Sequence, residues 1–81
     1  MTEPFDVPIR DESIRLGQFL KLANLVESGS DAKPAVQDGK VWVNGEVETR
    51  RGRQLRLGDL VELGGVTARV AAESVGDDLP W

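Results

Sequence analysis

The dipeptide Asn44-Gly45 constrains the fold of this chain more than any other feature of its sequence. Valines flank it, at positions 41 and 43 before it and at position 47 after it. A two-residue β-hairpin turn of type I′ needs positive φ at both central positions, which asparagine and glycine adopt at little cost. We therefore predict a β-hairpin here, with Val41, Val43 and Val47 on its buried side.

Further strands are expected on both sides of this hairpin. Segment 60–63 follows the turn Gly58-Asp59, and segment 66–71, with apolar residues at alternate positions, follows the turn Gly64-Gly65. Such alternation is typical of half-buried strands. The first 13 residues contain two prolines and no helical period, so they predict an arm with a short edge strand at Phe5–Ile9.

The remaining segments have the spacing of helices. Between Arg15 and Val26, apolar residues recur three and four positions apart, which is the period of one helix face. Ser30 is a suitable N-cap for a second short helix, Asp31–Asp38, and Gly39 stands where a left-handed C-terminal cap belongs. The chain is therefore expected to form an α+β domain, with two short helices packed on a small, mainly antiparallel sheet.

Charge is distributed unevenly along the chain. The formal net charge is -4, yet residues 15–58 carry eight basic and five acidic side chains, and both ends of the chain are acidic. Binding surfaces depend on local charge density and not on the molecular total. The basic centre therefore suggests a polyanionic partner. The alternative is that these charges simply face water.

The chain has no cysteine and no histidine. This excludes disulfides, thiolate nucleophiles, zinc sites built on sulfur or imidazole, and mechanisms that use a histidine base. The beginning of the sequence lacks the basic start and apolar run of a signal peptide, and no apolar run approaches the ~18 residues of a membrane span. We expect a cytoplasmic, non-catalytic protein without a metal, a cofactor or a membrane partner.

Taken in order, these elements resemble the RNA-binding domain named for small-subunit ribosomal protein S4, also called the αL RNA-binding motif. The resemblance is carried by Arg15-Leu16, Phe19-Leu20-Lys21, Leu25, Ser28, Ala32-Lys33, Val36, Gly39, Val41, Val43-Asn44-Gly45 and Gly58-Asp59. It is strongest to small free-standing bacterial members, in which the motif is almost the entire protein. The expected organisation is an N-terminal arm (1–14), an S4-like domain (15–63), a C-terminal strand of the same domain (64–73) and an acidic tail (74–81).

In that family, the two helices and the following hairpin loop form one basic face that binds structured RNA, usually ribosomal or transfer RNA. The resemblance implies that here this face consists of Arg15, Lys21, Lys33, Lys40, Arg50, Arg51 and Arg53. Its implied partner is structured RNA, with ribosomal RNA or the ribosome as the first candidate. The chain departs from the family at Gly17, Gly29 and Pro34, where an acidic residue and two basic residues are common.

Alternatives remain open for several of these residues. The arginine loop either contacts phosphate or is solvated, and we favour contact because arginines spaced only by Gly52 repel one another unless an anion binds. The basic face could instead dock an acidic protein surface, which would make the chain a protein interaction module. Trp42 either stacks on a base or covers a flank of the core. Asn44 and Asp59 are expected to fix turns.

Overall fold

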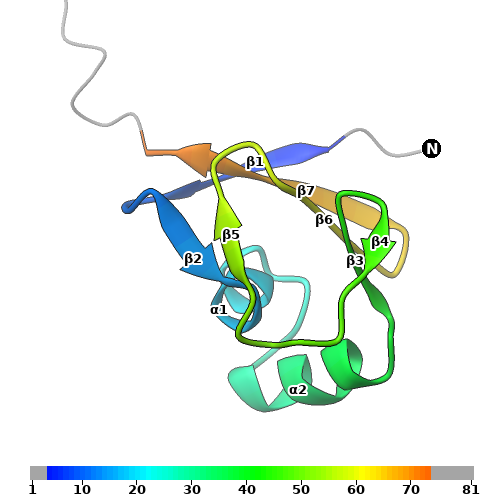
Figure 1. Ribbon diagram of the computed structural model, residues 1–81. Coiled ribbons are helices and arrows are strands. Elements are labelled where there is room, and N and C mark those ends of the chain that lie inside the picture. Colours follow the sequence, from blue (N-terminus) through cyan, green and yellow to red (C-terminus); the bar gives the residue numbers. More distant parts are fainter. Residues whose placement is uncertain (1–3, 74–81) are drawn as a thin grey trace, which may run out of the picture.

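The computed structural model describes residues 4–73 (Figure 1). The elements run in the order β1 (Phe5–Ile9), β2 (Ser13–Arg15), α1 (Leu16–Leu22), α2 (Gly29–Gln37), β3 (Val41–Val43), β4 (Glu46–Val47), β5 (Gln54–Arg56), β6 (Leu60–Leu63) and β7 (Val66–Ala72). The expected acidic tail, residues 74–81, lies outside the described residues. Within residues 4–73, neither helix is long and apolar enough to cross a membrane.

The strands form two sheets. A five-stranded sheet has the order β1-β7-β6-β3-β4, and β2 pairs with β5 in a separate antiparallel pair. Pairing in the larger sheet is antiparallel except between β1 and β7, which run parallel. The predicted fold class, two short helices on a mainly antiparallel sheet, is therefore confirmed. The predicted edge strand at Phe5–Ile9 is also present as β1, and its Val7 and Ile9 are buried.

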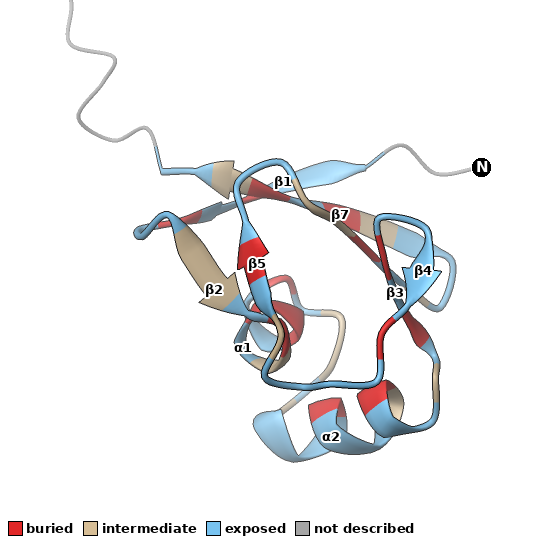
Figure 2. Cartoon of the chain, in the orientation of Figure 1, coloured by how far each residue is buried: buried red, intermediate tan, exposed pale blue. Residues whose placement is uncertain are grey.

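The hydrophobic core lies between one face of the larger sheet and the two helices (Figure 2). Apolar residues at alternate strand positions and at helical spacing reach it from both layers, as the two periodicities predict. Its buried members are Val7, Ile9, Leu16, Phe19, Leu20, Ala23, Ala32, Val36, Val41, Val43, Leu55, Val61, Ala68 and Val70. Burial of these side chains holds the helices on the sheet and so positions the loops between them.

The first helix is shorter than the predicted Arg15–Val26. Asn24 adopts the left-handed conformation, with φ of 62°. The Leu25 N–H then donates to the carbonyl of Leu20 (2.9 Å) and the Asn24 N–H to that of Lys21 (3.0 Å), which is the hydrogen-bond pattern of a Schellman motif. Asparagine thus ends α1 in the place where glycine is more usual, and the apolar period that continues beyond it does not extend the helix.

The second helix begins earlier than predicted, because its N-cap is Ser28 and not Ser30. The Asp31 N–H donates to the Ser28 carbonyl at 3.1 Å, so the first turn already includes Gly29. Pro34 therefore lies inside the helix, beyond its first turn. The left-handed residue predicted after the helix is confirmed, since Gly39 has φ of 73°.

The Asn44-Gly45 turn has positive φ at both residues, 51° and 86°, as predicted. Because this turn contains only two residues, Val43 pairs with Glu46 and Trp42 pairs with Val47. Residues opposite each other in an antiparallel pair point to the same face, so Val47 shares the outer face with Trp42 and is 48% exposed. The prediction that Val47 is buried is wrong, and Trp42, opposite it on that face, is 42% exposed.

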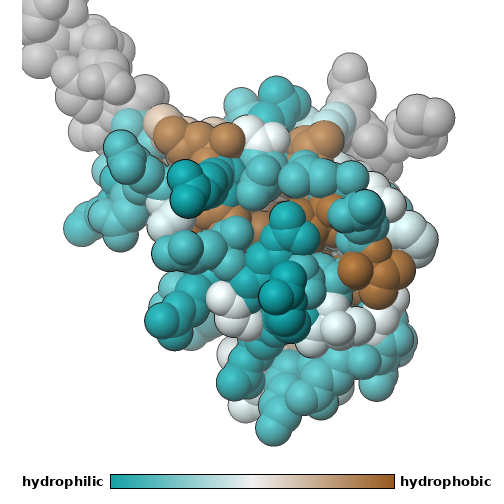
Figure 3. Space-filling model, in the orientation of Figure 1, coloured by the Kyte–Doolittle hydropathy of each residue, from teal (hydrophilic) through white to brown (hydrophobic). Residues whose placement is uncertain are grey.

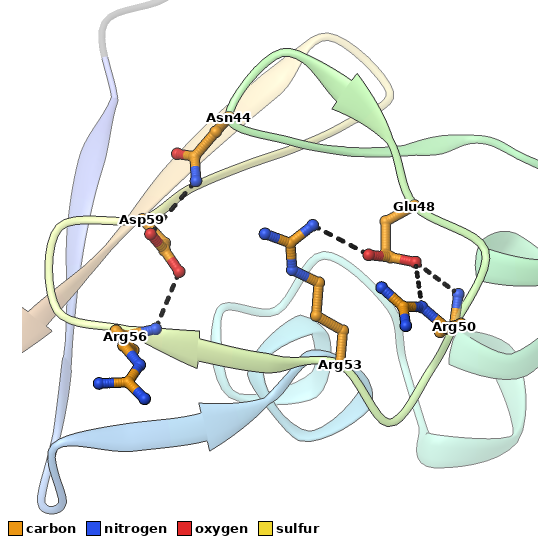
Figure 4. A network of polar contacts seen from close by, with 6 residues as sticks. All are labelled: Asn44, Glu48, Arg50, Arg53, Arg56 and Asp59. Carbon is orange, nitrogen blue, oxygen red and sulfur yellow. Dashed lines mark hydrogen bonds and ion pairs between the residues drawn. The ribbon is translucent and has the colours of Figure 1, made fainter.

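Side chains in two turns hold the hairpin against the neighbouring loop (Figure 4). The Asn44 amide nitrogen donates to the Asp59 carboxylate at 3.2 Å, and the Leu60 N–H donates to the Asn44 side-chain oxygen at 2.9 Å. Asp59 also accepts the backbone N–H of Arg56 at 2.9 Å. The prediction that Asn44 and Asp59 fix turns is confirmed, and together they connect β3 to the start of β6.

The hairpin register predicts losses of stability of very different size for two valines only four residues apart. Val43→Ala removes methyl groups from a fully buried position and should lower the free energy of unfolding by about 2 kcal/mol. Val47→Ala, on the outer face, should cost less than about 0.5 kcal/mol. Urea unfolding of both variants measures the difference, and equal losses would contradict this register.

Candidate nucleic-acid interface

The arginine-rich segment between β4 and β5 is joined directly to the beginning of α1. Within the segment, the Arg53 N–H donates to the Arg50 carbonyl at 3.2 Å and closes a turn around Arg51 and Gly52. Across to the helix, the Leu16 N–H donates to the Arg53 carbonyl (2.8 Å), and the Gly17 N–H donates to the Arg51 carbonyl (3.0 Å). The first N–H groups of a helix have no partner within it, so the loop satisfies two of them and takes a defined position.

Gly17 makes this close approach possible. A Cβ atom at this position would lie 2.7 Å from Cγ of Arg51 and 3.3 Å from its Cδ, and the first of these distances is too short for two carbon atoms. The Arg51 side chain therefore packs over α1 where any other residue would carry a side chain. Gly17 is also one of the positions at which the sequence departs from the family pattern. The absence of a side chain there leaves the space that the Arg51 side chain occupies.

Two shallow hollows adjoin at this junction and share Arg15 and Gly52. The first is lined by Arg15, Gly17, Gln18, Lys21, Gly29, Arg51 and Gly52. The second is lined by Arg15, Arg50, Gly52, Arg53 and Gln54. Hydrophilic side chains cover most of the molecular face seen in Figure 3.

The structure brings together five of the seven predicted site residues around these hollows, namely Arg15, Lys21, Arg50, Arg51 and Arg53. Lys33, on α2, and Lys40, which follows that helix, are exposed but line neither hollow. Sequence reasoning missed Gln18 and Gln54, which add amide groups to the lining. Gln18 follows Arg15 at i+3 on the same helical stripe, which is a signal that could have marked it.

The buried carboxylate of Glu48 points toward the side chains of Arg50 and Arg53 (Figure 4). Its Oε2 accepts the backbone N–H of Arg50 at 3.0 Å and the Nε–H of the same residue at 3.2 Å, and its Oε1 accepts an Nη1–H of Arg53 at 2.9 Å. Burial alone would raise the pKa of Glu48. The hydrogen bonds from the Arg50 backbone and from the Arg53 and Arg50 side chains, with the charge of Arg50, outweigh burial and lower the pKa from 4.5 to about 2.

The position of Glu48 follows from the hairpin register that also exposes Val47. The Glu48 N–H donates to the carbonyl of Val41 at 2.9 Å, so Glu48 stands opposite a fully buried residue and its side chain, 7% exposed, is directed inward. Counting back across the two-residue turn from Val43 and Glu46 would have predicted this from the sequence. We counted Glu48 only as one of the acidic charges.

The arrangement suits the binding of phosphate. Guanidinium groups present several N–H donors in a plane and bind two oxygens of one phosphate, and an ammonium group supplies a compact charge. The hollows are open and shallow, and the residues that line them include no histidine, cysteine or carboxylate. The geometry therefore offers an open cationic surface on which an anion can bind.

The S4 domain model matches residues 7–71 of this chain. The chain belongs to the S4 domain family. This S4 domain is 49% identical over 59 residues to the probable ribosome maturation protein RlbA of Bacillus subtilis strain 168, a match that covers 73% of this chain and 83% of RlbA. It is 39% identical over 59 residues to the putative RNA-binding protein YbcJ of Escherichia coli K12, with 73% of this chain and 84% of YbcJ covered.

Solved structures agree with this assignment. The solution structure of Escherichia coli YbcJ, which has an αL motif involved in RNA binding, matches this S4 domain with a TM-score of 0.66 and 33% identity over 89% of this chain and 92% of YbcJ. The crystal structure of the 30S ribosomal protein S4e of Thermoplasma acidophilum matches with a TM-score of 0.63 and 22% identity. That match covers 83% of this chain and 35% of S4e and shows the fold alone. The family predicted from the sequence is confirmed.

The buried carboxylate predicts a pH-dependent contribution to stability. The folded pKa of Glu48, about 2, lies below its ordinary value of 4.5, so its contribution is complete above about pH 5 and disappears as the pH falls towards 2. Glu48→Gln should therefore lower the free energy of unfolding by about 1 to 2 kcal/mol at neutral pH, less than the full pKa shift would give, because its partner Arg50 is 79% exposed and solvent screens the pair. Urea unfolding of both proteins should show this difference narrowing below about pH 4. A difference that stays constant down to about pH 2.5 would contradict it.

The stabilities of Gly29→Ala and Gly17→Ala test whether Arg51 packs against α1. A Cβ at Gly29 would meet no atom within 4 Å, so Gly29→Ala should raise the free energy of unfolding by up to about 0.5 kcal/mol through helix propensity. Gly17→Ala has the same intrinsic advantage, but the new methyl group must displace Arg51, so the variant should be no more stable than the parent protein. Thermal unfolding of the two variants tests this, and an equal gain would show that Arg51 is not held against α1.

Proposed function

We propose that this S4 domain is a non-catalytic module that binds structured RNA, with ribosomal RNA or the ribosome as its partner. The binding face consists of the loop 49–53 and the adjoining start of α1. The observation that carries the proposal is the convergence of Arg15, Lys21 and Arg51 on one hollow, with Arg50 and Arg53 on the next. Cations that neutralise adjacent phosphates release condensed counterions, which is a main source of affinity for nucleic acids.

The chemistry of the lining favours recognition of the RNA backbone. The hollows contain cationic groups and two glutamine amides but no aromatic side chain, so they lack the flat platforms on which unpaired bases stack. Contacts to phosphates position a protein on a folded RNA by its shape, without a direct reading of base sequence. The glutamines Gln18 and Gln54 are suited to the 2′-hydroxyl groups that distinguish RNA from DNA.

The names of the relatives support the same proposal. RlbA is a probable ribosome maturation protein and YbcJ a putative RNA-binding protein. We extend the proposed face along α2 to Lys33 and Lys40, which are exposed and would meet phosphates farther along a bound RNA. The shortfall of cations at Gly29 and Pro34 leaves the loop arginines with the larger share of the contacts.

Removal of Arg51 should weaken RNA binding and reduce its salt dependence. We expect Arg51→Ala to raise Kd roughly tenfold for labelled fragments of ribosomal RNA, as one charge-assisted phosphate contact is lost. The slope of log Kd against log salt should fall by about 0.7 to 0.9. Fluorescence anisotropy at several salt concentrations measures both quantities.

Arg69→Ala is the matched control, because it removes the same charge from the outer face of β7, where Arg69 pairs with Asp6 (3.3 Å). It should leave both the affinity and the slope close to those of the parent protein. Polyglutamate serves as a competitor that represents an acidic protein surface. If polyglutamate displaces the RNA at equal charge concentration, or if Arg51→Ala and Arg69→Ala behave alike, the proposed RNA face is wrong.

A further inference from the structure

A carboxylate beside a phosphate-binding loop is unexpected, since its charge repels the ligand. Glu48 is nevertheless the acidic residue that lies nearest in sequence to the loop arginines, and it contacts two of them, Arg50 and Arg53, directly. Its contacts differ from those of an exposed ion pair because the carboxylate itself is buried, with only 7% of the side chain accessible. A buried charge with several donors is held rigidly, whereas exposed pairs are loose and contribute little.

The contacts of Glu48 hold the loop without occupying its arginines. Arg50 uses its Nε–H and Arg53 uses Nη1, and a guanidinium has further N–H donors directed elsewhere. The Arg50 side chain remains 79% exposed and that of Arg53 31% exposed. One carboxylate therefore orients two guanidinium groups while their remaining donors stay available to an anion.

Glu48 also fixes the backbone turn that presents Arg51. It accepts the backbone N–H of Arg50, and the Arg50 carbonyl in turn accepts the N–H of Arg53. On the far side of this turn, the Gly17 N–H donates a hydrogen bond to the Arg51 carbonyl. The loop is thus held from the hairpin by Glu48 and from α1 by Gly17. Among the described residues no carboxylate pairs with Arg51, so its charge is left for the first hollow.

Two effects of Glu48 on anion binding oppose each other. Its negative charge repels a phosphate, but the positive charges of Arg50 and Arg53, which pair with the carboxylate, offset much of that repulsion. Its ordering of the loop acts in the other direction, because long side chains that are already immobilised lose less conformational entropy when the ligand binds. We expect the second effect to be the larger one, since it acts on two side chains and on the backbone of the turn.

We propose that Glu48 is a positioning residue of the RNA-binding face, whose carboxylate holds the Arg50–Arg53 turn in its binding orientation and so raises the affinity for a polyanion. This inference rests on the proposed function above. It predicts that removal of a negative charge from the neighbourhood of the interface weakens the binding of RNA. A purely electrostatic view of the face predicts the reverse.

Glu48→Gln and Glu46→Gln form a matched pair for the test. Both neutralise one glutamate in the segment that follows the Asn44-Gly45 turn, two residues apart, but Glu46 is exposed and makes no ion pair among the described residues. With a fluorescein-labelled RNA stem–loop containing a bulge as the probe, we expect Glu48→Gln to bind roughly fivefold more weakly than the parent protein. Glu46→Gln should bind as well as the parent or slightly more tightly. Circular dichroism at the assay temperature establishes that each variant is folded.

Glu48→Met provides a second variant if the glutamine variant does not fold. Methionine removes the same hydrogen bonds, and the two arginines left without a partner are 79% and 31% exposed, so water can solvate them and no buried charge is left unpaired. The same loss of affinity is expected for this variant.

A double-mutant cycle separates positioning from a general effect on the fold. In a protein that already carries Arg50→Ala and Arg53→Ala, Glu48→Gln should have a smaller effect on affinity, because the side chains that it orients are gone and only its hydrogen bond to the backbone N–H of residue 50 remains. An equal loss of affinity in both backgrounds would overturn the inference. It would also be overturned if Glu48→Gln bound RNA as tightly as Glu46→Gln or more tightly. In either case, RNA binding by the parent protein would leave the proposed function intact. Absence of binding by the parent protein itself would overturn both.

Discussion

The two-residue turn at Asn44-Gly45 is the constraint on which the rest of this structure depends. Its positive φ angles bring β4 back along β3 with no freedom in register, and side chains in a strand alternate between faces. A single choice of turn therefore determines that Val41 and Val43 enter the core and that Val47 does not. The same choice directs Glu48 inward, towards the arginines that follow it. Asn44 adds to this by its hydrogen bonds to Asp59 and Leu60, which join the hairpin to the next strand.

The electrostatics of the molecule are local. The chain carries a formal net charge of -4, yet five cationic side chains adjoin two connected hollows. Burial of Glu48 is tolerable because three donors satisfy its carboxylate, and a buried charge without such partners would be strongly destabilising. The acidic residue thus becomes part of the framework of a basic loop. Charge maps drawn along the sequence count Glu48 against the arginines, whereas the fold makes it their support.

Much of the fold could be predicted from residue patterns, and the errors have identifiable causes. Helices and strands were found wherever the apolar period was clear, because that period reflects which face meets the core. The predicted C-terminal end of α1 and the predicted N-terminal end of α2 were wrong. Ser28 and Ser30 are equally suitable N-caps by residue type, and the apolar period continues past Asn24. Backbone hydrogen bonds decide where each helix begins or ends. Val47 was misplaced because the alternation of inward and outward residues was carried through the turn as if one strand continued. Across a two-residue turn Val47 stands opposite Trp42, so both side chains point outward.

The sequence by itself determined the hairpin, the family, the two apolar helix faces and the concentration of cations between residues 15 and 58, because each depends on local conformational preference or on the order of residue types. It did not determine which of those cations meet. Arg15 and Arg51 are far apart along the chain and become neighbours only because the N–H groups at the start of α1 need acceptors and find them in the arginine loop. Lys33 and Lys40 have the same charge but project from other elements. Only tertiary packing brings distant side chains to one surface, since it depends on how the helices sit on the sheet and not on any property that a residue carries in the unfolded chain.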